Sequence, residues 1–170
     1  MTSQGEVGFY NCSEEQQIDI LIERVKEGDR CYDLLNAAKE QKRLEHLLSL
    51  FVQLLSIKDE RVMLATHDVV TEYSADGRVK SEPVNERVDD TLFMEYLLYI
   101  LRDNLPKNSI HIGAMVHAYE NEGDPWTRMR IVRAIGRIGG EYAVNFCRLV
   151  LKNEGEYRTM AAQEASKYIK

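Results

Sequence analysis

One tryptophan and three arginines recur at helical spacing near the carboxyl end of the chain. Trp126, Arg130, Arg133 and Arg137 are 4, 3 and 4 residues apart, which places them within about 60° on one face of an α-helix. Tryptophan and arginine are enriched at protein interfaces, where rigid rings and forked guanidinium groups supply much of the binding energy. The pattern predicts a protein-binding surface, which we call the Trp/Arg strip. The alternative interpretation is a solvated charged face whose arginines pair with neighbouring acids.

Residue types that carry catalysis or bind metals occur without the spacing that such chemistry needs. The metalloprotease, nucleophile-elbow and phosphate-loop motifs are absent. Asp89 and Asp90 are adjacent, so on a helix they do not face each other. The remaining candidates are interpreted as residues that fill or border the core: His46, His67, His111, His117, Cys12, Cys31 and Cys147. We therefore expect no catalytic residue, no bound metal and no cofactor.

Composition is typical of one soluble globular domain. The 170 residues include 28 acidic and 22 basic side chains, for a net charge of −6, and 44% are apolar. Three widely spaced cysteines do not form a disulfide framework, the amino-terminal sequence does not resemble a secretion signal, and no apolar run is long enough to span a membrane. These features predict a cytoplasmic chain without a membrane segment.

Charge is distributed unevenly along the chain. Residues 1–123 hold 23 acidic and 13 basic side chains, a net charge of −10, whereas residues 124–170 hold 5 and 9, a net charge of +4. An acidic surface repels nucleic acid, so most of the chain is unsuited to that partner. A protein partner with complementary charges is the expectation.

The elements that would position the strip are helices, because the apolar positions keep helical period and proline is rare. A capping box at Ser13–Gln16 predicts the first helix start, Gly28 its end, and Gln41 a later break. We expect a flexible amino-terminal arm over 1–12 and a single domain over 13–170.

A loop insertion at 74–88 is either functional or mobile. Helices are predicted over 44–55, 59–73, 89–103, 110–119, 125–138, 141–151 and 154–169.

Acidic residues that could begin a helix recur at nearly constant spacing. Asp29, Asp59, Asp89, Asp124 and Glu154 are separated by 30, 30, 35 and 30 residues. Such side chains accept hydrogen bonds from the free N–H groups of a first helical turn and suit the positive end of the helix dipole. The period predicts stacked pairs of helices.

Residues 124–139 resemble the second helix of a HEAT-like repeat of the phycobilisome-lyase type. The matching positions are the Asp124-Pro125 start, Arg128, and the ending Ala134-Ile135-Gly136-Arg137-Ile138-Gly139. Residues 141–151 resemble the next first helix, and 154–169 and 59–73 are imperfect copies. The resemblance implies an all-α, short right-handed α–α superhelix, a HEAT/armadillo-like solenoid of about five helix pairs, some of them degenerate. It also implies a structural role for the arginine at 128 and a concave position for the strip.

When the angular position of the strip is projected onto the neighbouring predicted helices, further charged residues fall on the same concave side. Asp68 and Glu72 fall on one helix and Glu95 on the next, so the expected partner-binding set is the strip together with these three acids. We expect a non-catalytic inhibitor or immunity-type protein that binds one protein partner, such as a toxin. The alternatives are a scaffold or chaperone subunit, or a HEAT-like enzyme that excises DNA bases or acts as a lyase.

Overall fold

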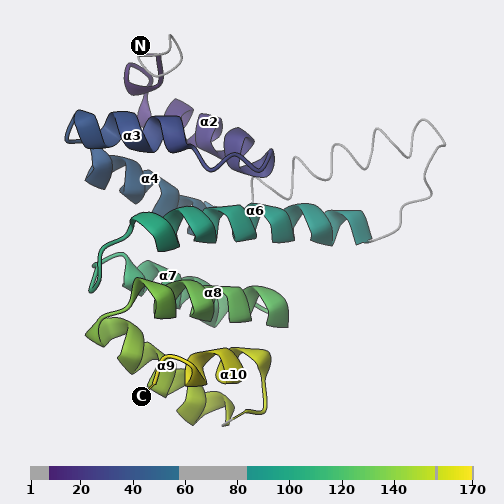
Figure 1. Ribbon diagram of the computed structural model, residues 1–170. Helices are drawn as coiled ribbons and strands as arrows, with labels where there is room; N and C mark the ends of the chain where they lie inside the picture. Colours follow the sequence, from purple (N-terminus) through teal and green to yellow (C-terminus); the bar gives the residue numbers. More distant parts are fainter. Residues whose placement is uncertain (1–7, 58–83, 156, 170) are drawn as a thin grey trace, which may run out of the picture. The chain divides into compact units, whose positions relative to one another are not determined.

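All elements that the structure describes are helices. The computed structural model describes residues 8–57, 84–155 and 157–169, and no strand occurs in these ranges (Figure 1). The all-α prediction is confirmed for this part of the chain, where no helix combines the length and apolar composition needed to cross a bilayer. The helices are α2 (Glu14–Lys26), α3 (Tyr32–Glu40), α4 (Leu44–Ile57), α6 (Val84–Asn104), α7 (Ile112–Asn121), α8 (Pro125–Ile138), α9 (Glu141–Glu154) and α10 (Met160–Ser166).

The chain divides into two compact units, Met1–Tyr96 and Leu97–Lys170, which are described in turn. The prediction of a single domain over 13–170 stays a prediction. In the first unit, α4 packs against α2 and α3. Buried side chains of these three helices include Leu21, Ile22, Val25, Leu34, Leu35, Ala37, Ala38, Leu47, Leu48, Leu50, Phe51, Leu54 and Leu55.

Local signals at the ends of the first helices behave as predicted. Ser13 Oγ accepts from the backbone N–H of Gln16 at 3.3 Å, and Gln16 Oε1 accepts from the N–H of Ser13 at 3.0 Å, which completes the capping box. Gly28 follows α2 with a φ of +80°, a conformation that glycine adopts without a Cβ penalty. α3 ends at Glu40 with Gln41 as its C-cap, so the predicted break is confirmed.

The predicted amino-terminal arm stays a prediction, and its described residues contact the first unit. Residues 8–10 form a helical turn, and Phe9 is only 3% exposed. Gln17 Nε2 donates to the Phe9 carbonyl at 3.0 Å, and Tyr10 Oη donates to the carbonyl of Leu34 at 3.3 Å. These contacts attach the turn to α2 and α3. Burial of the Phe9 ring stabilises this position of the turn.

Four of the five predicted helix starts are corrected or lie outside the described residues. Asp29 precedes α3 by three residues; its Oδ1 accepts from the N–H of Cys31 at 2.7 Å, and its Oδ2 pairs with Arg24. Asp89 lies inside α6, which begins at Val84. Residues 84–88 of the predicted loop are therefore helical. Asp59, the helix over 59–73 and the rest of the loop lie outside the described residues.

The predicted start at Glu154 is also wrong, whereas that at Asp124 is confirmed. Glu154 is the last residue of α9, and the following helix, α10, begins at Met160 with Thr159 as its N-cap. Thr159 Oγ1 accepts from the N–H of Ala162 at 3.1 Å, so a threonine takes the capping role that spacing had assigned to an acid. The predicted buried helix over 89–103 lies within α6, where its apolar side chains from residue 93 onward are buried.

In the second unit, α7, α9 and α10 each pack against α8. α8 and α10 run side by side in the same direction, because Arg133 pairs with Glu164 and Gly136 lies against Tyr168, pairs that are 31 and 32 residues apart. Small residues allow this approach: Ala161, Ala162 and Ala165 of α10 are all buried, as predicted for the last two.

Candidate protein-binding surface

The strip is carried by α8, whose two ends are set by local sequence. Asp124 caps the helix: its Oδ2 accepts from the N–H and from Oγ1 of Thr127, both at 2.8 Å. Pro125 occupies the first helical position, where its missing N–H costs no hydrogen bond. Gly139, with a φ of +76°, ends the helix. The predicted helix over 125–138 is confirmed.

Burial around α8 differs between its faces. Trp126 is 58% exposed and Arg137 is also exposed, whereas Arg130 and Arg133 are half-buried. Most of the flanking and opposite positions are covered by the unit itself. Buried residues of α8 are Thr127, Met129, Ile131, Val132, Ala134, Ile135 and Ile138. The Trp/Arg strip therefore reaches solvent, as do Pro125 at the start of the helix and part of the Arg128 side chain.

Arg133 is held in place by a carboxylate of α10. Its Nε and Nη2 donate to the two carboxylate oxygens of Glu164 at 3.0 and 3.3 Å, and Lys167 Nζ lies 2.7 Å from the same group. Tyr168 Oη donates to Glu164 at 3.1 Å. Burial opposes ionisation of Glu164, whose side chain is 5% exposed, but these donors lower its pKa to about 2. The alternative interpretation, pairing with a neighbouring acid, therefore holds for this arginine.

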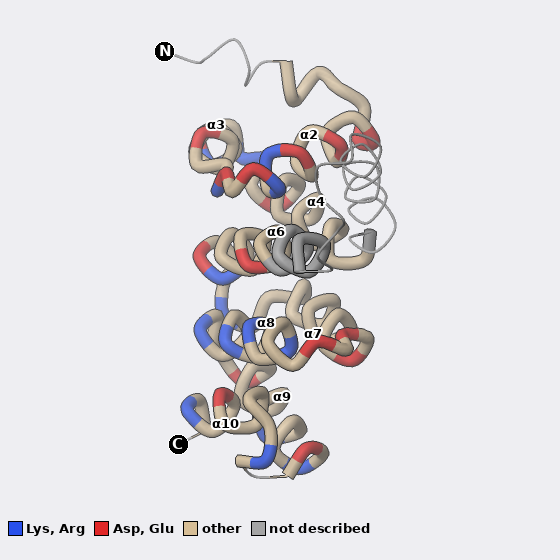
Figure 2. Tube along the Cα trace, turned by 90° about the vertical axis from the view of Figure 1, so that its right-hand side faces the viewer, with Lys and Arg blue, Asp and Glu red and all other residues tan. Residues whose placement is uncertain are grey.

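Positive charge still predominates along the strip. The strip carries three arginines and no acidic residue, and its Arg133 shares the buried carboxylate of Glu164 with the exposed Lys167. Figure 2 shows basic residues along one side of α8 and at the adjacent end of α10, and acidic residues of α7 on the other side of this unit. The sequence analysis missed Glu164 and Lys167, because only the register between α8 and α10 brings them to the strip.

A polar cluster beneath the start of α8 combines residues of α7, α8 and α9 with the N-cap residue of α10. Tyr119 of α7, Arg128 of α8 and Thr159 before α10 all bond to the carboxylate of Glu154 at the end of α9. The guanidinium carbon of Arg128 also lies 4.2 Å from the centre of the Tyr119 ring, a cation–π distance. These contacts support the structural role that the resemblance implies for Arg128.

Ionisation in this cluster follows from its geometry. Burial and the neighbouring Glu154 carboxylate raise the pKa of Tyr119 to about 12. Burial works against the charged forms of Glu154 and Arg128, but their mutual pairing and the hydroxyl donors lower the pKa of the carboxyl group and raise that of the guanidinium group. The cluster therefore stays an ion pair at neutral pH.

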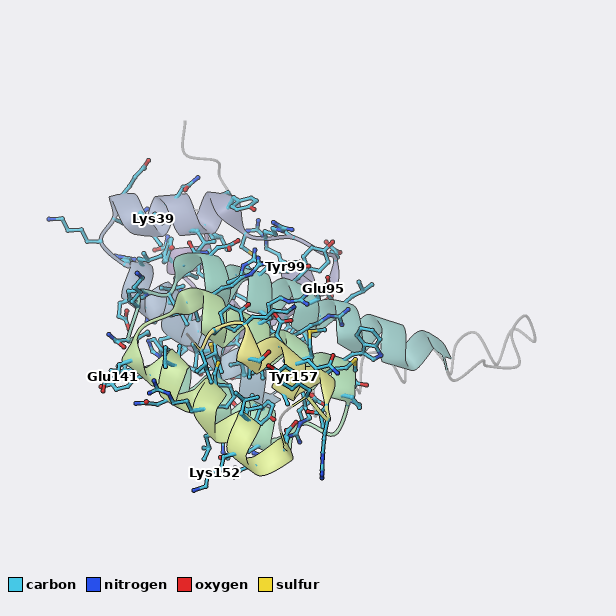
Figure 3. All side chains as sticks on the ribbon, turned by 60° about the horizontal axis from the view of Figure 1, so that its bottom comes forward. Lys39, Glu95, Tyr99, Glu141, Lys152 and Tyr157 are labelled. Carbon is cyan, nitrogen blue, oxygen red and sulfur yellow. The ribbon has the colours of Figure 1, made fainter. Side chains whose placement is uncertain are left out.

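A cavity opens beside this cluster at the amino-terminal end of α8. It has a volume of about 340 Å³ and is lined by Pro125, Arg128, Glu154, Thr159, Met160 and Ala161. Trp126 directly follows one lining residue. Tyr157, in the link between α9 and α10, is 59% exposed (Figure 3). Two exposed aromatic residues are thus adjacent in sequence to the lining of this cavity.

The other predicted site residues are not brought to the strip by the described structure. Asp68 and Glu72 lie outside the described residues. Glu95 is half-buried on α6 in the first unit, so its role stays a prediction. Within the described ranges, no three His, Cys, Asp or Glu side chains are grouped as metal ligands.

The cysteines differ in their surroundings. Cys31 and Cys147 are buried, which confirms their interpretation as core residues, and burial raises the pKa of their thiols to about 12 and about 11. Cys12 is only half-buried and its thiol donates to the carbonyl of Gly8 at 3.2 Å. The core interpretation is therefore wrong for Cys12.

No protein-family model, curated protein or solved structure matches the chain. The resemblance of residues 124–139 to HEAT-like repeats therefore stays a prediction, and the arguments about function below use the geometry of the second unit.

Proposed function

We propose that this chain is a non-catalytic protein-binding module that binds one protein partner through the Trp/Arg strip. The observation that carries the proposal is the burial pattern of α8: seven residues on its other faces are buried, whereas a tryptophan and arginines reach solvent on the strip. A large exposed aromatic side chain beside guanidinium groups is the composition of energetic hot spots at interfaces. Partner binding would bury the Trp126 ring that now lies in water.

We infer that the helices are stacked as a short HEAT/armadillo-like superhelix. The parallel pairing of α8 with α10, at offsets of 31 and 32 residues, is what successive second helices of such repeats would make. In that arrangement the strip lines the concave side. Asp68, Glu72 and Glu95 would then extend the binding surface with acidic groups, and the partner would carry complementary charges.

We also propose that the chain acts as a small cytoplasmic inhibitor of the immunity type, whose partner is a toxin. Its length of 170 residues and its net charge of −6 fit a dedicated single-partner inhibitor. All three cysteines are free thiols, which fits a reducing compartment. Binding to the partner, with no chemistry on it, would be sufficient for inhibition.

Affinity capture with strip variants tests the proposal. The tagged chain, Trp126→Ala and Arg137→Glu are each incubated with an extract of the organism that encodes it. Both substitutions change exposed side chains, so folding should be unaffected. Arg148→Glu, on the exposed side of α9, is the matched control because it makes the same charge change away from the strip.

We expect one protein to be retained in equimolar amount by the wild type and by Arg148→Glu, and to be lost with both strip variants. A single truncated hot-spot residue costs 2 kcal/mol or more, roughly a thirtyfold loss of affinity. Retention of the same protein by all four forms would show that the strip is not the binding surface.

A further inference from the structure

Three cations gather where the carboxyl-terminal half of α8 packs against the end of α10. Arg133 Nη2 and Lys167 Nζ both bind Oε2 of Glu164, at 3.3 and 2.7 Å. The two nitrogens therefore lie within about 6 Å of each other. Arg137 follows Arg133 by one helical turn, a spacing at which side chains on one face are about 5–6 Å apart at Cβ. We call Arg133, Arg137 and Lys167 the cation cluster.

Contacts within the unit fix the positions of the cation cluster. Glu164 is buried and also accepts a hydrogen bond from Tyr168 Oη at 3.1 Å. Burial and Glu164 raise the pKa of Tyr168, and the interaction of its hydroxyl group with Arg137 opposes that rise, so Arg137 lies close to the same hydroxyl group. Each cation is thus connected to Glu164 either directly or through Tyr168. A partner would meet cations that are already placed beside one another.

Positive charge in the cation cluster exceeds the negative charge beside it. Arg133 and Lys167 share the single carboxylate of Glu164. Within the described ranges, no carboxylate forms an ion pair with Arg137. Like charges four residues apart on a helix, such as Arg133 and Arg137, repel each other. Carboxylates supplied by another molecule would offset both the excess charge and this repulsion.

We propose that the protein partner contacts the cation cluster through an acidic segment. Arg133 uses Nε and Nη2 for Glu164, so its Nη1 is directed to a carboxylate of the partner. Arg137 and Lys167 are exposed. Alternate side chains of an extended chain point to the same side about 7 Å apart, which is close to the separation of the cations. Two acids at alternate positions therefore bridge the cluster. This inference rests on the proposed function and specifies the chemistry of the partner.

A protein segment suits this surface better than a nucleic acid does. Nucleic-acid binding gains its affinity by neutralising many phosphates, whereas the cation cluster holds three cations in a chain with a net charge of −6. Figure 2 shows acidic residues of α7 on the other side of this unit. A long polyanion that extended past α8 would therefore meet like charge.

Peptide binding to the full chain tests the inference. The probe is fluorescein-labelled hexaglutamate, whose binding is followed by fluorescence anisotropy and by the amide chemical shifts of the ¹⁵N-labelled protein. Hexaglutamine is the uncharged control, and labelled hexathymidylate is titrated in parallel at low and high salt. We expect hexaglutamate to shift amides in 133–137 and 164–168. It should bind at least about tenfold more tightly than hexaglutamine, because the cation cluster attracts carboxylates.

Substitutions in the cation cluster should weaken hexaglutamate binding, whereas the same charge changes on α9 should not. Arg137→Glu should lower the affinity at least about tenfold, and Lys167→Gln should lower it about fivefold. The matched controls are Arg148→Glu and Lys152→Gln, at exposed positions of α9; Figure 3 shows Lys152 pointing away from the ribbon of this helix. Each control should change the affinity by less than about twofold. Circular dichroism verifies that each variant is folded.

Equal binding of hexaglutamate and hexaglutamine, or equal losses in the cluster variants and their controls, would overturn the inference. Failure of hexaglutamate to bind, while Trp126→Ala and Arg137→Glu still abolish capture of a protein partner, would overturn the acidic segment and leave the proposed function standing. Loss of hexaglutamate binding in the cluster variants alone, with no protein captured by any form, would support the preference for carboxylates and contradict the proposed function. Tighter, steeply salt-dependent binding of hexathymidylate would overturn both and identify a nucleic-acid surface.

Discussion

Replacing Gly136 by alanine should destabilise the protein, although the same change stabilises most helices. Gly136 lies inside α8, and a Cβ built on it would be 2.5 Å from Cγ and 2.6 Å from Cε2 of the Tyr168 ring. Atoms do not approach that closely without a shift. The ring would have to leave its position over α8, and its hydroxyl would lose the 3.1 Å hydrogen bond to Glu164.

Two opposing contributions set the size of the effect. In an unobstructed helix, glycine to alanine lowers the free energy of the folded state by about 0.5–1 kcal/mol. Overpacking of this kind costs about 1–3 kcal/mol, so Gly136→Ala should reduce the free energy of unfolding by about 1–2 kcal/mol. In a Tyr168→Ala background the obstruction is absent. The same substitution should then raise the free energy of unfolding by about 0.5–1 kcal/mol.

Urea unfolding of the four proteins, followed by circular dichroism, measures this double-mutant cycle. The sign change between the two backgrounds corresponds to a coupling free energy of about 2 kcal/mol. Tyr168→Phe is the control, because it keeps the ring and removes only the hydroxyl, so Gly136→Ala should remain destabilising there. Additive free energies, or stabilisation by Gly136→Ala in the wild-type background, would refute the packing of Tyr168 on α8.

Three further predictions concern caps, charge and thiols. Glu164→Gln should lower the free energy of unfolding by about 1–3 kcal/mol at neutral pH. Because folding lowers the pKa of this carboxyl group from 4.5 to about 2, its contribution to stability is present above pH 4.5 and is lost as the pH falls from 4.5 to 2. Unfolding measured over this pH range should show that loss in the wild type and not in the variant. Asp124→Ala should cost about 1 kcal/mol in thermal unfolding, with Asp124→Asn restoring most of it. In the native protein a thiol reagent should modify Cys12 rapidly and Cys31 and Cys147 only on unfolding, so two or more fast thiols would contradict the burial of the latter pair.

Where a signal in the sequence involves neighbouring residues, the fold agrees with it. The capping box at Ser13, the glycine after α2 and the Asp-Pro start of α8 each depend on backbone groups within a few positions. Their hydrogen bonds are local, so the residues that make them can be recognised without knowledge of the packing. The same holds for the angular position of the strip, which depends only on helical period.

The regular spacing of acids predicted helix starts less well, because a carboxylate has several uses. Asp29 bonds to the N–H of Cys31 and pairs with Arg24, and neither role begins a helix. Glu154 ends α9, where the helix dipole disfavours negative charge, and Arg128 compensates it. With 28 acids in 170 residues, spacing alone does not distinguish a cap from an ion-pair partner.

The surroundings of the strip could not be predicted because they depend on the register between α8 and α10. Arg133 meets Glu164 only when the two helices lie parallel with an offset of about 31 residues. The cavity has the same origin, since its lining combines the start of α8 with the end of α9 and the start of α10.

The pairing of Arg133 with Glu164 supports binding by the strip rather than opposing it. Both contacts use one edge of the guanidinium group, Nε and Nη2, and 39% of the side chain remains exposed. The buried carboxylate fixes the direction of the Arg133 side chain. Binding of a partner would therefore lose less side-chain entropy than binding to a freely rotating arginine. Neutralisation is incomplete, because Lys167 shares the same carboxylate and Arg137 lies one turn further along the helix. Glu164→Gln should therefore weaken partner binding as well as stability, whereas a surface of merely solvated charges would lose stability alone.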